Sequence, residues 1–555
     1  HLFNTPELRQ LIEGWSDDKL SRLSRGGHDP RKVYAAMHEA VHHKDQPTIL
    51  LIQTIKGLGM GEAGEAANDT HSQKKMNKES LLAFRDRFHV PLQDDELEAL
   101  PFIKPPPGSP EAEFIKETRS ALGGSIPVRQ FSPNPLDVPE LSEFQAVLDG
   151  SGDREISTTM GFVRILSILL RNKAIADRIV PIVPDEARTF GMEGLFKQVG
   201  IYNPKGQVYT PVDKGTLMWY REDTKGQLLQ EGINEAGGFS SWLAAGTSYA
   251  NHNIPMIPFF AYYSMFGFQR VGDLAWAAGD LLAKGFLIGA TAGRTTLNGE
   301  GLQHQDGHHL LLAATLPSCC AYDPSFVYEM AVIIQDGLKR MYQDGEEIFY
   351  YITAMNENFA QPAMPAGVEE GIRRGIYRFQ ASAKKKPKAK VHLLGSGSIF
   401  IEVREAARIL EQDYGVAADI WSAPGIVPLY RDAVDCVREQ TLDPKSKRRP
   451  YVEEALDQVD PQGGEPAIIS TDYLKAYGNL VAPYIKRPCY TLGTDGYGRS
   501  DSRQALREHF EVSRKYIVLS ALHALVEQGQ LEPSVLKSAG KKLGVDKGKA
   551  NPRLA

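Results

Sequence analysis

A carboxylate stands at the head of a run of small and apolar residues, where Glu235 opens the sequence Glu-Ala-Gly-Gly-Phe-Ser-Ser-Trp-Leu-Ala-Ala-Gly246. The small side chains would let this helix-like segment pack very close to a neighbour. An acid that enters a packed, mostly apolar helix start costs free energy unless something pairs with it. A helix N-terminus favours negative charge, so a capping glutamate is one interpretation. A ligand that needs a buried proton partner is the other.

A second candidate is the glycine-rich stretch Lys56–Gly64, whose residues 59–64 match Gly-x-Gly-x-x-Gly. A dinucleotide site would need a helix there, then a second strand that ends in an acid about 20 residues further on. The residues from Glu65 to His71 are polar, and no apolar strand follows before Phe88. A mobile polar loop over a site is therefore the better interpretation.

Alternating strands and helices must position these residues. Helical spacing predicts helices over 31–41, 158–170, 268–282, 399–414 and 516–527. Apolar runs predict strands over 48–55, 178–183, 254–260, 285–291, 391–394, 418–422, 467–470 and 490–492. Such alternation, with polar loops at strand ends, predicts parallel, doubly wound α/β sheets.

One of these strand ends carries further chemistry, because Asp185, Glu186 and Arg188 follow the strand over 178–183. Open α/β sheets bind ligands at the carboxyl ends of their strands. A simple ion pair of the acids with Arg188 is the alternative.

The bulk composition excludes several classes of protein. The 555 residues are 42% apolar and 24% charged, which is typical of a globular protein of three to four domains. The net charge of −6 gives no indication of nucleic acid or anionic membrane as a partner. No apolar run approaches the roughly 20 residues of a membrane span. Four cysteines without a Cys-x-x-Cys motif suit a reducing cytoplasm.

Linkers divide the chain. Prolines recur from 101 to 139, which predicts a long connector, and the lysine-rich run over 384–390 predicts a solvated linker. The chain begins His1-Leu-Phe without Met, so we expect an upstream part to be absent.

Several blocks together resemble one family. They are Thr54–Gly61, Asp185–Gly194, Glu231–Glu235, Tyr262–Arg270, Leu297–His304, Leu492–Arg503 and Asn551–Ala555. With these blocks the chain resembles the homodimeric bacterial pyruvate dehydrogenases, the thiamine-diphosphate-dependent decarboxylating components of the pyruvate dehydrogenase complex. The match extends over essentially the whole chain.

The resemblance implies three transketolase-like, doubly wound α/β domains, the first only partly present. Residues 1–134 would be the remainder of the diphosphate-binding domain with a linker, 135–380 the pyrimidine-binding domain, and 381–555 the transketolase-type C-terminal domain. Thiamine diphosphate and Mg²⁺ are the implied cofactors. The magnesium signature, Gly-Asp-Gly followed by an asparagine, does not occur in this sequence, so no metal ligand is assigned within it.

The resemblance also implies roles for single residues. Glu235 matches the glutamate that hydrogen-bonds the aminopyrimidine ring, and its small, apolar neighbours predict the dry setting that such proton work needs. Tyr263 and Phe266 match aromatic residues beside that ring, with ordinary core packing as the alternative. Asp185 and Glu186 match acids near the cofactor.

The remaining assignments concern the substrate end of the site. Lys56 and His304 match residues that line it, although a loop histidine is often only solvated. His71 matches the histidine that passes the two-carbon unit to the lipoyl group. The implied partners are pyruvate, the lipoyl domain of a dihydrolipoyl acetyltransferase and a second copy of the chain, in the cytoplasm.

Two rival functions remain open from the sequence. A transketolase would share fold and cofactor, but we would not expect it to carry the blocks Asp185–Gly194 and Leu492–Arg503. A non-catalytic assembly subunit would have no need of Glu235, His71 and His304.

Overall fold

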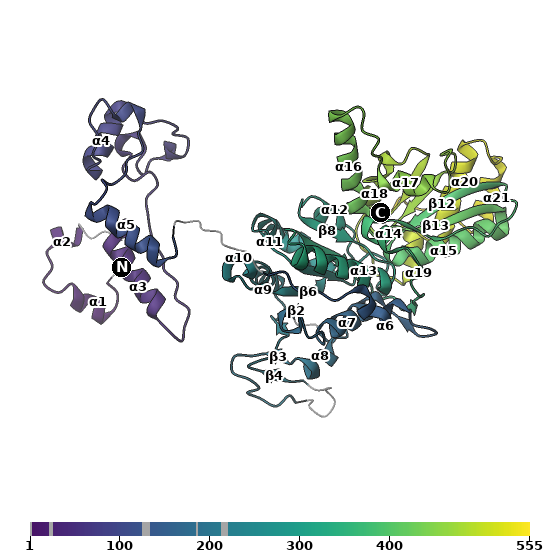
Figure 1. The fold of residues 1–555 in the computed structure, drawn as a ribbon, viewed down its shortest axis with the longest axis horizontal. Coiled ribbons are helices and arrows are strands. Elements are labelled where there is room, and N and C mark those ends of the chain that lie inside the picture. The colour runs from purple at the N-terminus through teal and green to yellow at the C-terminus, as the bar shows by residue number, and fades with distance from the viewer. Residues whose placement is uncertain (1–2, 22–25, 125–133, 185–186, 213–219) are drawn as a thin grey trace. The chain divides into compact units, whose positions relative to one another are not determined.

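The computed structural model describes residues 3–21, 26–124, 134–184, 187–212 and 220–555. They fall into two compact units, His1–Val128 and Arg129–Ala555 (Figure 1). Asp185 and Glu186 lie outside the described residues.

The N-terminal unit is helical among its described residues. Its elements are α1 (Pro6–Leu11), α2 (Asp17–Ser21), α3 (Pro30–His42), α4 (Lys78–Phe88) and α5 (Pro110–Ala121), with 3₁₀ turns η1 (Gly61–Ala63), η2 (Asn68–His71) and η3 (Leu97–Ala99). Helix α3 confirms the helix predicted over 31–41. The proline-rich connector is not wholly irregular, because Ser109 caps α5 by accepting a hydrogen bond from the Ala112 amide at 3.2 Å.

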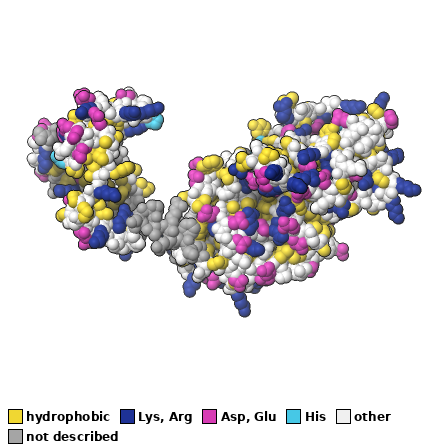
Figure 2. Space-filling view, turned by 45° about the horizontal axis from the view of Figure 1, so that its top comes forward, with side chains coloured by type: hydrophobic (Ala, Val, Ile, Leu, Met, Phe, Trp, Pro, Cys, Tyr) yellow, Lys and Arg dark blue, Asp and Glu magenta, His cyan; other side chains and the backbone are white. Residues whose placement is uncertain are grey.

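The strand predicted over 48–55 is wrong for this chain. Residues 47–55 form neither helix nor strand, and Ile49 and Leu51 are 84% and 95% exposed. A strand needs a neighbour to receive its backbone hydrogen bonds and a surface to cover its side chains. The described residues of this unit supply neither, and Leu97 is their only buried large hydrophobic residue. Figure 2 shows apolar side chains over the surface of the smaller body.

The C-terminal unit contains a six-stranded, all-parallel sheet in the order β5-β2-β6-β7-β9-β8. Its strands are β2 (Ile179–Val183), β5 (Leu229–Gln230), β6 (Ile257–Tyr263), β7 (Phe286–Ala290), β8 (Cys319–Tyr322) and β9 (Phe349–Thr353). The strand predicted over 254–260 begins three residues later and includes Tyr263.

Helices cover both faces of this sheet, as in a doubly wound fold (Figure 1). On one face lie α9 (Glu235–Gly246), α10 (Ser248–His252), α11 (Phe268–Asp280) and α12 (His309–Ala314), and on the other α7 (Thr158–Leu169) and α13 (Val327–Leu338). Successive residues of β6 alternate between the two cores: Phe260 and Tyr262 pack with α9 and α11, whereas Phe259 and Ala261 pack with α7 and α13. Ser157 caps α7 by accepting a hydrogen bond from the Met160 amide at 3.1 Å.

A second sheet has the order β11-β13-β12-β14-β15, parallel except for β11. Its strands are β11 (Tyr377–Gln380), β12 (Ala389–Gly395), β13 (Val416–Ser422), β14 (Ala467–Ser470) and β15 (Cys489–Leu492). The covering helices are α15 (Phe400–Ile409), α16 (Ile426–Leu442), α17 (Tyr451–Asp457), α18 (Lys475–Asn479), α19 (Arg503–His509), α20 (Arg514–Glu527) and α21 (Ser534–Lys542). The four strands predicted in this region are confirmed, and so is the helix predicted over 516–527.

Candidate active site

The candidate site lies at the carboxyl edge of the six-stranded sheet. Strand β6 ends at Tyr263, and β5 leads within five residues to Glu235, the first residue of α9. Strand β7 ends at Ala290 and leads into the segment that carries His304. Because parallel strands all end at the same edge, the topology gathers these residues where α/β sheets bind ligands.

Three of the predicted site residues form one aromatic cluster. The ring of Tyr263 lies 5.0 Å from that of His304 and 5.8 Å from that of Phe266, both in edge-on geometry. Phe266, in the 3₁₀ turn η6 (Ser264–Phe266), lies 5.5 Å from His304. Phe190 adds a fourth ring, 5.3 Å from Tyr263. Phe190 is buried, whereas Tyr263, Phe266 and His304 are only partly buried, which leaves ring surface for a planar ligand.

His304 is partly buried, and one of its ring nitrogens has no hydrogen-bond partner among the described residues. Its side chain is 18% exposed, and Nδ1 lies 3.3 Å from the Glu300 carboxylate. No hydrogen bond forms there with suitable geometry, so among the described residues this buried nitrogen has no hydrogen-bond partner. Buried polar atoms in native proteins are normally satisfied. Nδ1 of His304 therefore has capacity for a ligand or water.

Glu235 stands where the sequence predicts, in the first turn of α9. The side chain of Asn234 caps this helix by accepting from the Gly237 amide at 3.1 Å. No hydrogen bond or ion pair within the described part of the chain reaches the Glu235 carboxylate. It is half-buried, and its neighbours Ile233 and Ala236 are exposed. The expected dry setting is therefore wrong for a single copy of this chain, because several small residues of α9 face outward.

The N-terminal unit brings together the two other predicted residues. Lys56 and His71 are joined by a hydrogen bond of 2.8 Å between Nζ and Nδ1. The glycine-rich turn between them is closed by Glu65, which accepts from the Gly59 amide at 3.0 Å and from Arg87 at 2.6 Å. Arg87 holds the pKa of Glu65 below its usual value. The expected loop is thus a defined turn, and no dinucleotide-type helix follows Gly64, since α4 begins only at Lys78.

One group of residues in the described chain has metal-ligand types within reach of one another: His392, Asp460 and Glu465. Nε2 of His392 lies 3.2 Å from Glu465, while Trp421 donates to Nδ1 at 3.2 Å. This bond places the proton of the neutral ring on Nε2, where a metal would need a lone pair. Arg487 already pairs with Asp460 at 2.7 Å. The arrangement is that of a buried ion-pair network.

Sequence reasoning missed several residues that support the site. Phe190 lies within the block Asp185–Gly194, but no local signal marks it as a ring partner of Tyr263. Asp472 and Arg507 anchor the segment that carries His304, from 177 and 212 residues away. Contacts of such range leave no pattern in a single sequence.

Comparison with known proteins bears directly on this arrangement. Residues 136–362 match the family model of the pyruvate dehydrogenase E1 component middle domain, and residues 375–513 match the transketolase-like C-terminal domain. The pyruvate dehydrogenase E1 component of Pseudomonas aeruginosa is 56% identical over 100% of this chain, and that of Escherichia coli K12 is 51% identical over 100%. The chain is similar over its whole length to pyruvate dehydrogenase E1 components, and one of its segments matches the middle domain of that enzyme. The chain spans 62% of the length of each of these relatives.

The solved structures show that the chain has a transketolase-like fold. A transketolase from Campylobacter jejuni superposes with a TM-score of 0.59 at 17% identity, over 89% of this chain and 66% of the other. One from Leishmania mexicana gives 0.59 at 14% identity, over 90% and 65%. These likenesses confirm the predicted fold class. None of the described helices is both long and apolar enough to cross a membrane.

Proposed function

We propose that this chain is the pyrimidine-binding and C-terminal part of a pyruvate dehydrogenase E1 component. The whole enzyme would decarboxylate pyruvate on thiamine diphosphate with Mg²⁺ and transfer the two-carbon unit to the lipoyl group of a dihydrolipoyl acetyltransferase. The observation that carries the proposal is the convergence of Tyr263, Phe266 and His304 at the strand edge beside the start of α9, in a chain so similar to named E1 components. Domain boundaries near 134 and 380, a homodimer and a cytoplasmic location belong to the same proposal.

The residues present fit the aromatic half of this cofactor. Tyr263 and Phe266 offer partly exposed ring surface to a planar heterocycle. The Glu235 carboxyl group, which has no partner among the described residues, can hydrogen-bond to a ring nitrogen of that heterocycle. Thiamine diphosphate, when bound, supplies the carbon nucleophile and the electron sink that a 2-oxoacid needs to lose carbon dioxide. We assign no residue of this chain to the diphosphate or to Mg²⁺.

Three residues of this chain would donate or accept protons near the bound cofactor. Glu235, the first residue of α9, would share a proton with a ring nitrogen of the bound heterocycle. A second copy covering the exposed side of α9 would exclude water from this carboxylate and strengthen the interaction. His304 can donate to the oxygens of pyruvate, since charge develops on them as the new bond forms. His71, oriented by Lys56, can protonate the lipoyl sulfur as it leaves.

Calorimetry and turnover together test the proposal. The chain extended to the full length of its relatives should bind thiamine diphosphate with Mg²⁺ and reduce an artificial electron acceptor when pyruvate is added. Binding without pyruvate turnover, but with two-carbon transfer between ketose and aldose phosphates, would favour the transketolase alternative. An extended chain that binds neither cofactor nor pyruvate would support an assembly subunit instead.

A further inference from the structure

The segment that carries His304 is joined by several hydrogen bonds to one distant stretch of the C-terminal domain. We call Arg294–His308 the His304 loop and Asp495–Arg507 the cradle. Backbone and side-chain hydrogen bonds connect them: Gly299 amide to Asp501 carbonyl (2.9 Å), Ser500 hydroxyl to Gly299 carbonyl (2.6 Å), Arg499 amide to Gln305 Oε1 (2.7 Å), Arg503 amide to Asn298 Oδ1 (3.0 Å), Arg503 Nε to Thr296 carbonyl (2.5 Å), and Arg294 to the Gly496 carbonyl. The cradle includes most of the block Leu492–Arg503, to which the proposed mechanism assigns no role.

The base of the loop is fixed by a buried carboxylate beside the cradle. Asp472, which follows β14, accepts from both the amide and the hydroxyl of Thr295 at 3.1 Å and from the Ser398 hydroxyl at 2.9 Å. Gly293 has φ +88°, and a Cβ there would lie 2.3 Å from Asp472 Oδ2. The Asp472 carboxylate thus occupies the space that a side chain at position 293 would need. This close contact fixes the base of the His304 loop against the C-terminal sheet.

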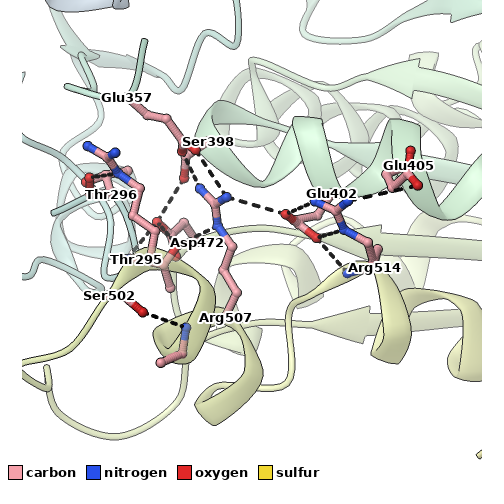
Figure 3. A network of polar contacts seen from close by, with 12 residues as sticks. Thr295, Thr296, Glu357, Ser398, Glu402, Glu405, Asp472, Ser502, Arg507 and Arg514 are labelled. Atoms are coloured by element: carbon pink, nitrogen blue, oxygen red, sulfur yellow. Dashed lines mark hydrogen bonds and ion pairs between the residues drawn. The ribbon is translucent and has the colours of Figure 1, made fainter. Parts of the chain in front are cut away.

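Arg507 connects this base to a chain of charged residues, of which Arg507 and Glu402 are buried (Figure 3). Its Nε donates to the Thr295 hydroxyl at 3.3 Å, and its terminal nitrogens pair with Glu357 and Glu402. Arg514 then donates to Glu402 at 2.7 Å, so two arginines balance two glutamates. A buried guanidinium is tolerated only when its hydrogen bonds are filled, and here they hold it in place. The Arg507 guanidinium therefore has a structural role, because its hydrogen bonds are used within the protein.

These hydrogen bonds extend to Gln305, the residue next to His304. The Gln305 side chain is clamped by the Arg499 amide, and a Cβ at Gly498 would lie 2.8 Å from it. Gln305 is buried, so the backbone on which His304 stands cannot shift without breaking this contact. We propose that Arg503 and Arg507 are positioning residues for His304, which set its ring against Tyr263 and Phe266. What His304 does there rests on the proposed function.

The test compares Arg503→Ala and Arg507→Lys with the parent in the full-length enzyme. Hydrogen–deuterium exchange of peptides covering 294–308 should accelerate roughly tenfold or more in both variants, because lost anchors allow local opening. The imidazole signal of His304, in protein labelled with ¹⁵N-histidine and assigned by His304→Gln, should shift. The kcat for pyruvate-dependent acceptor reduction should fall about 10- to 100-fold, as displaced catalytic groups do, with a much smaller change in KM. Arg503→Lys should recover part of the loss, since its ammonium can still reach the Thr296 carbonyl.

Arg448→Ala is the matched control. This half-exposed arginine also pairs with two acids, Asp432 and Glu439, within the C-terminal domain, and it makes no bond to the His304 loop. It should leave exchange, the His304 signal and kcat unchanged. If Arg507→Lys does not fold, Arg503→Ala still decides, because its side chain is half-exposed.

Two results would overturn the inference: unchanged exchange over 294–308 in Arg503→Ala, or faster exchange with an unmoved His304 signal. Exchange and imidazole signals need no turnover. If the enzyme had no activity with pyruvate, the proposed function would be wrong. The exchange rates and the imidazole signal would still test whether Arg503 and Arg507 position His304.

Discussion

Lys56 donates a hydrogen bond from Nζ to Nδ1 of His71 across the glycine-rich turn, at 2.8 Å. An ammonium group has no lone pair, so Nδ1 is the acceptor and the neutral ring carries its proton on Nε2. The pair thus presents an N–H donor from an exposed turn, with a positive charge behind it. The lipoyl arm of the proposed reaction would need such a donor and such accessibility.

The first prediction concerns this pair. His71→Ala should lower the overall reaction, measured as NADH formed in the reconstituted complex, by about 100-fold or more, which is typical of a lost general acid. Pyruvate-dependent reduction of an artificial acceptor should change far less. His89→Ala, at the end of α4, is the control. Equal losses in both assays would place His71 in decarboxylation instead.

The second prediction concerns Glu235. Glu235→Gln should abolish acceptor reduction almost completely, with a loss of at least about 100-fold. It should change stability by less than about 1 kcal/mol, since only the interaction with the helix N-terminus is lost. Glu369→Gln is a matched control, because Glu369 is also a half-buried acid that opens a helix (α14, Glu369–Arg374). Activity retained in Glu235→Gln would exclude the proposed proton role.

The third prediction concerns pH and Asp472. Burial raises the pKa of this carboxyl group from its usual 3.8 to about 7. The folded state therefore holds a proton that the unfolded state releases between these two values. Its contribution to stability is complete below the lower value and is lost as pH rises through about 7, by up to about 1.4 kcal/mol per pH unit. In Asp472→Asn this dependence should vanish.

Thermal unfolding midpoints at several pH values from 4.5 to 8 provide the measurement, expressed as the difference between parent and Asp472→Asn. The difference should change steadily up to about pH 7 and then level off. Parallel profiles over the whole range would show that Asp472 does not titrate there.

The fourth prediction concerns the exposed apolar residues of the N-terminal unit. An extended, uncovered hydrophobic segment promotes association with other chains. Replacing both Ile49 and Leu51 by Lys should therefore reduce light scattering and dye binding by the isolated 555-residue chain. The unfolding of the C-terminal unit should not change. Tyr34→Lys, at another exposed position (71%), is the control, and equal effects of both changes would point to net charge alone.

The sequence predicted the sheets better than the site. Strands β2, β7 and β14 are continuous apolar runs, as buried parallel strands are, and their predicted bounds differ from the observed ones by at most a residue. The strand predicted over 254–260 begins three residues before β6 because Ile254, Pro255 and Met256 extend the apolar run. The segment 48–55 has the same apolar character but lacks partners, which no local pattern can reveal.

Site residues were predicted one by one, but their grouping needed the fold. Tyr263 and His304 are 41 positions apart in the sequence, and the path of β6 and β7 across the sheet brings their rings together. Glu235 is only half-buried, contrary to the expected dry setting, because small residues pack closely only where something covers them. Asp472 and Arg507 could not have been found at all, since their roles exist only through contacts between the two sheets.

The hydrogen bonds between the His304 loop and the cradle can form only after the cradle has been synthesised. Thr295 leaves the ribosome 212 residues before Arg507, its hydrogen-bond partner. At roughly 5–20 residues per second, the loop waits on the order of ten seconds or more for its anchors. A nascent chain halted before the cradle already holds every strand of the six-stranded sheet, yet its His304 is unanchored. If the proposed function holds, catalytic competence would therefore arise only after the cradle has been synthesised and has anchored the His304 loop.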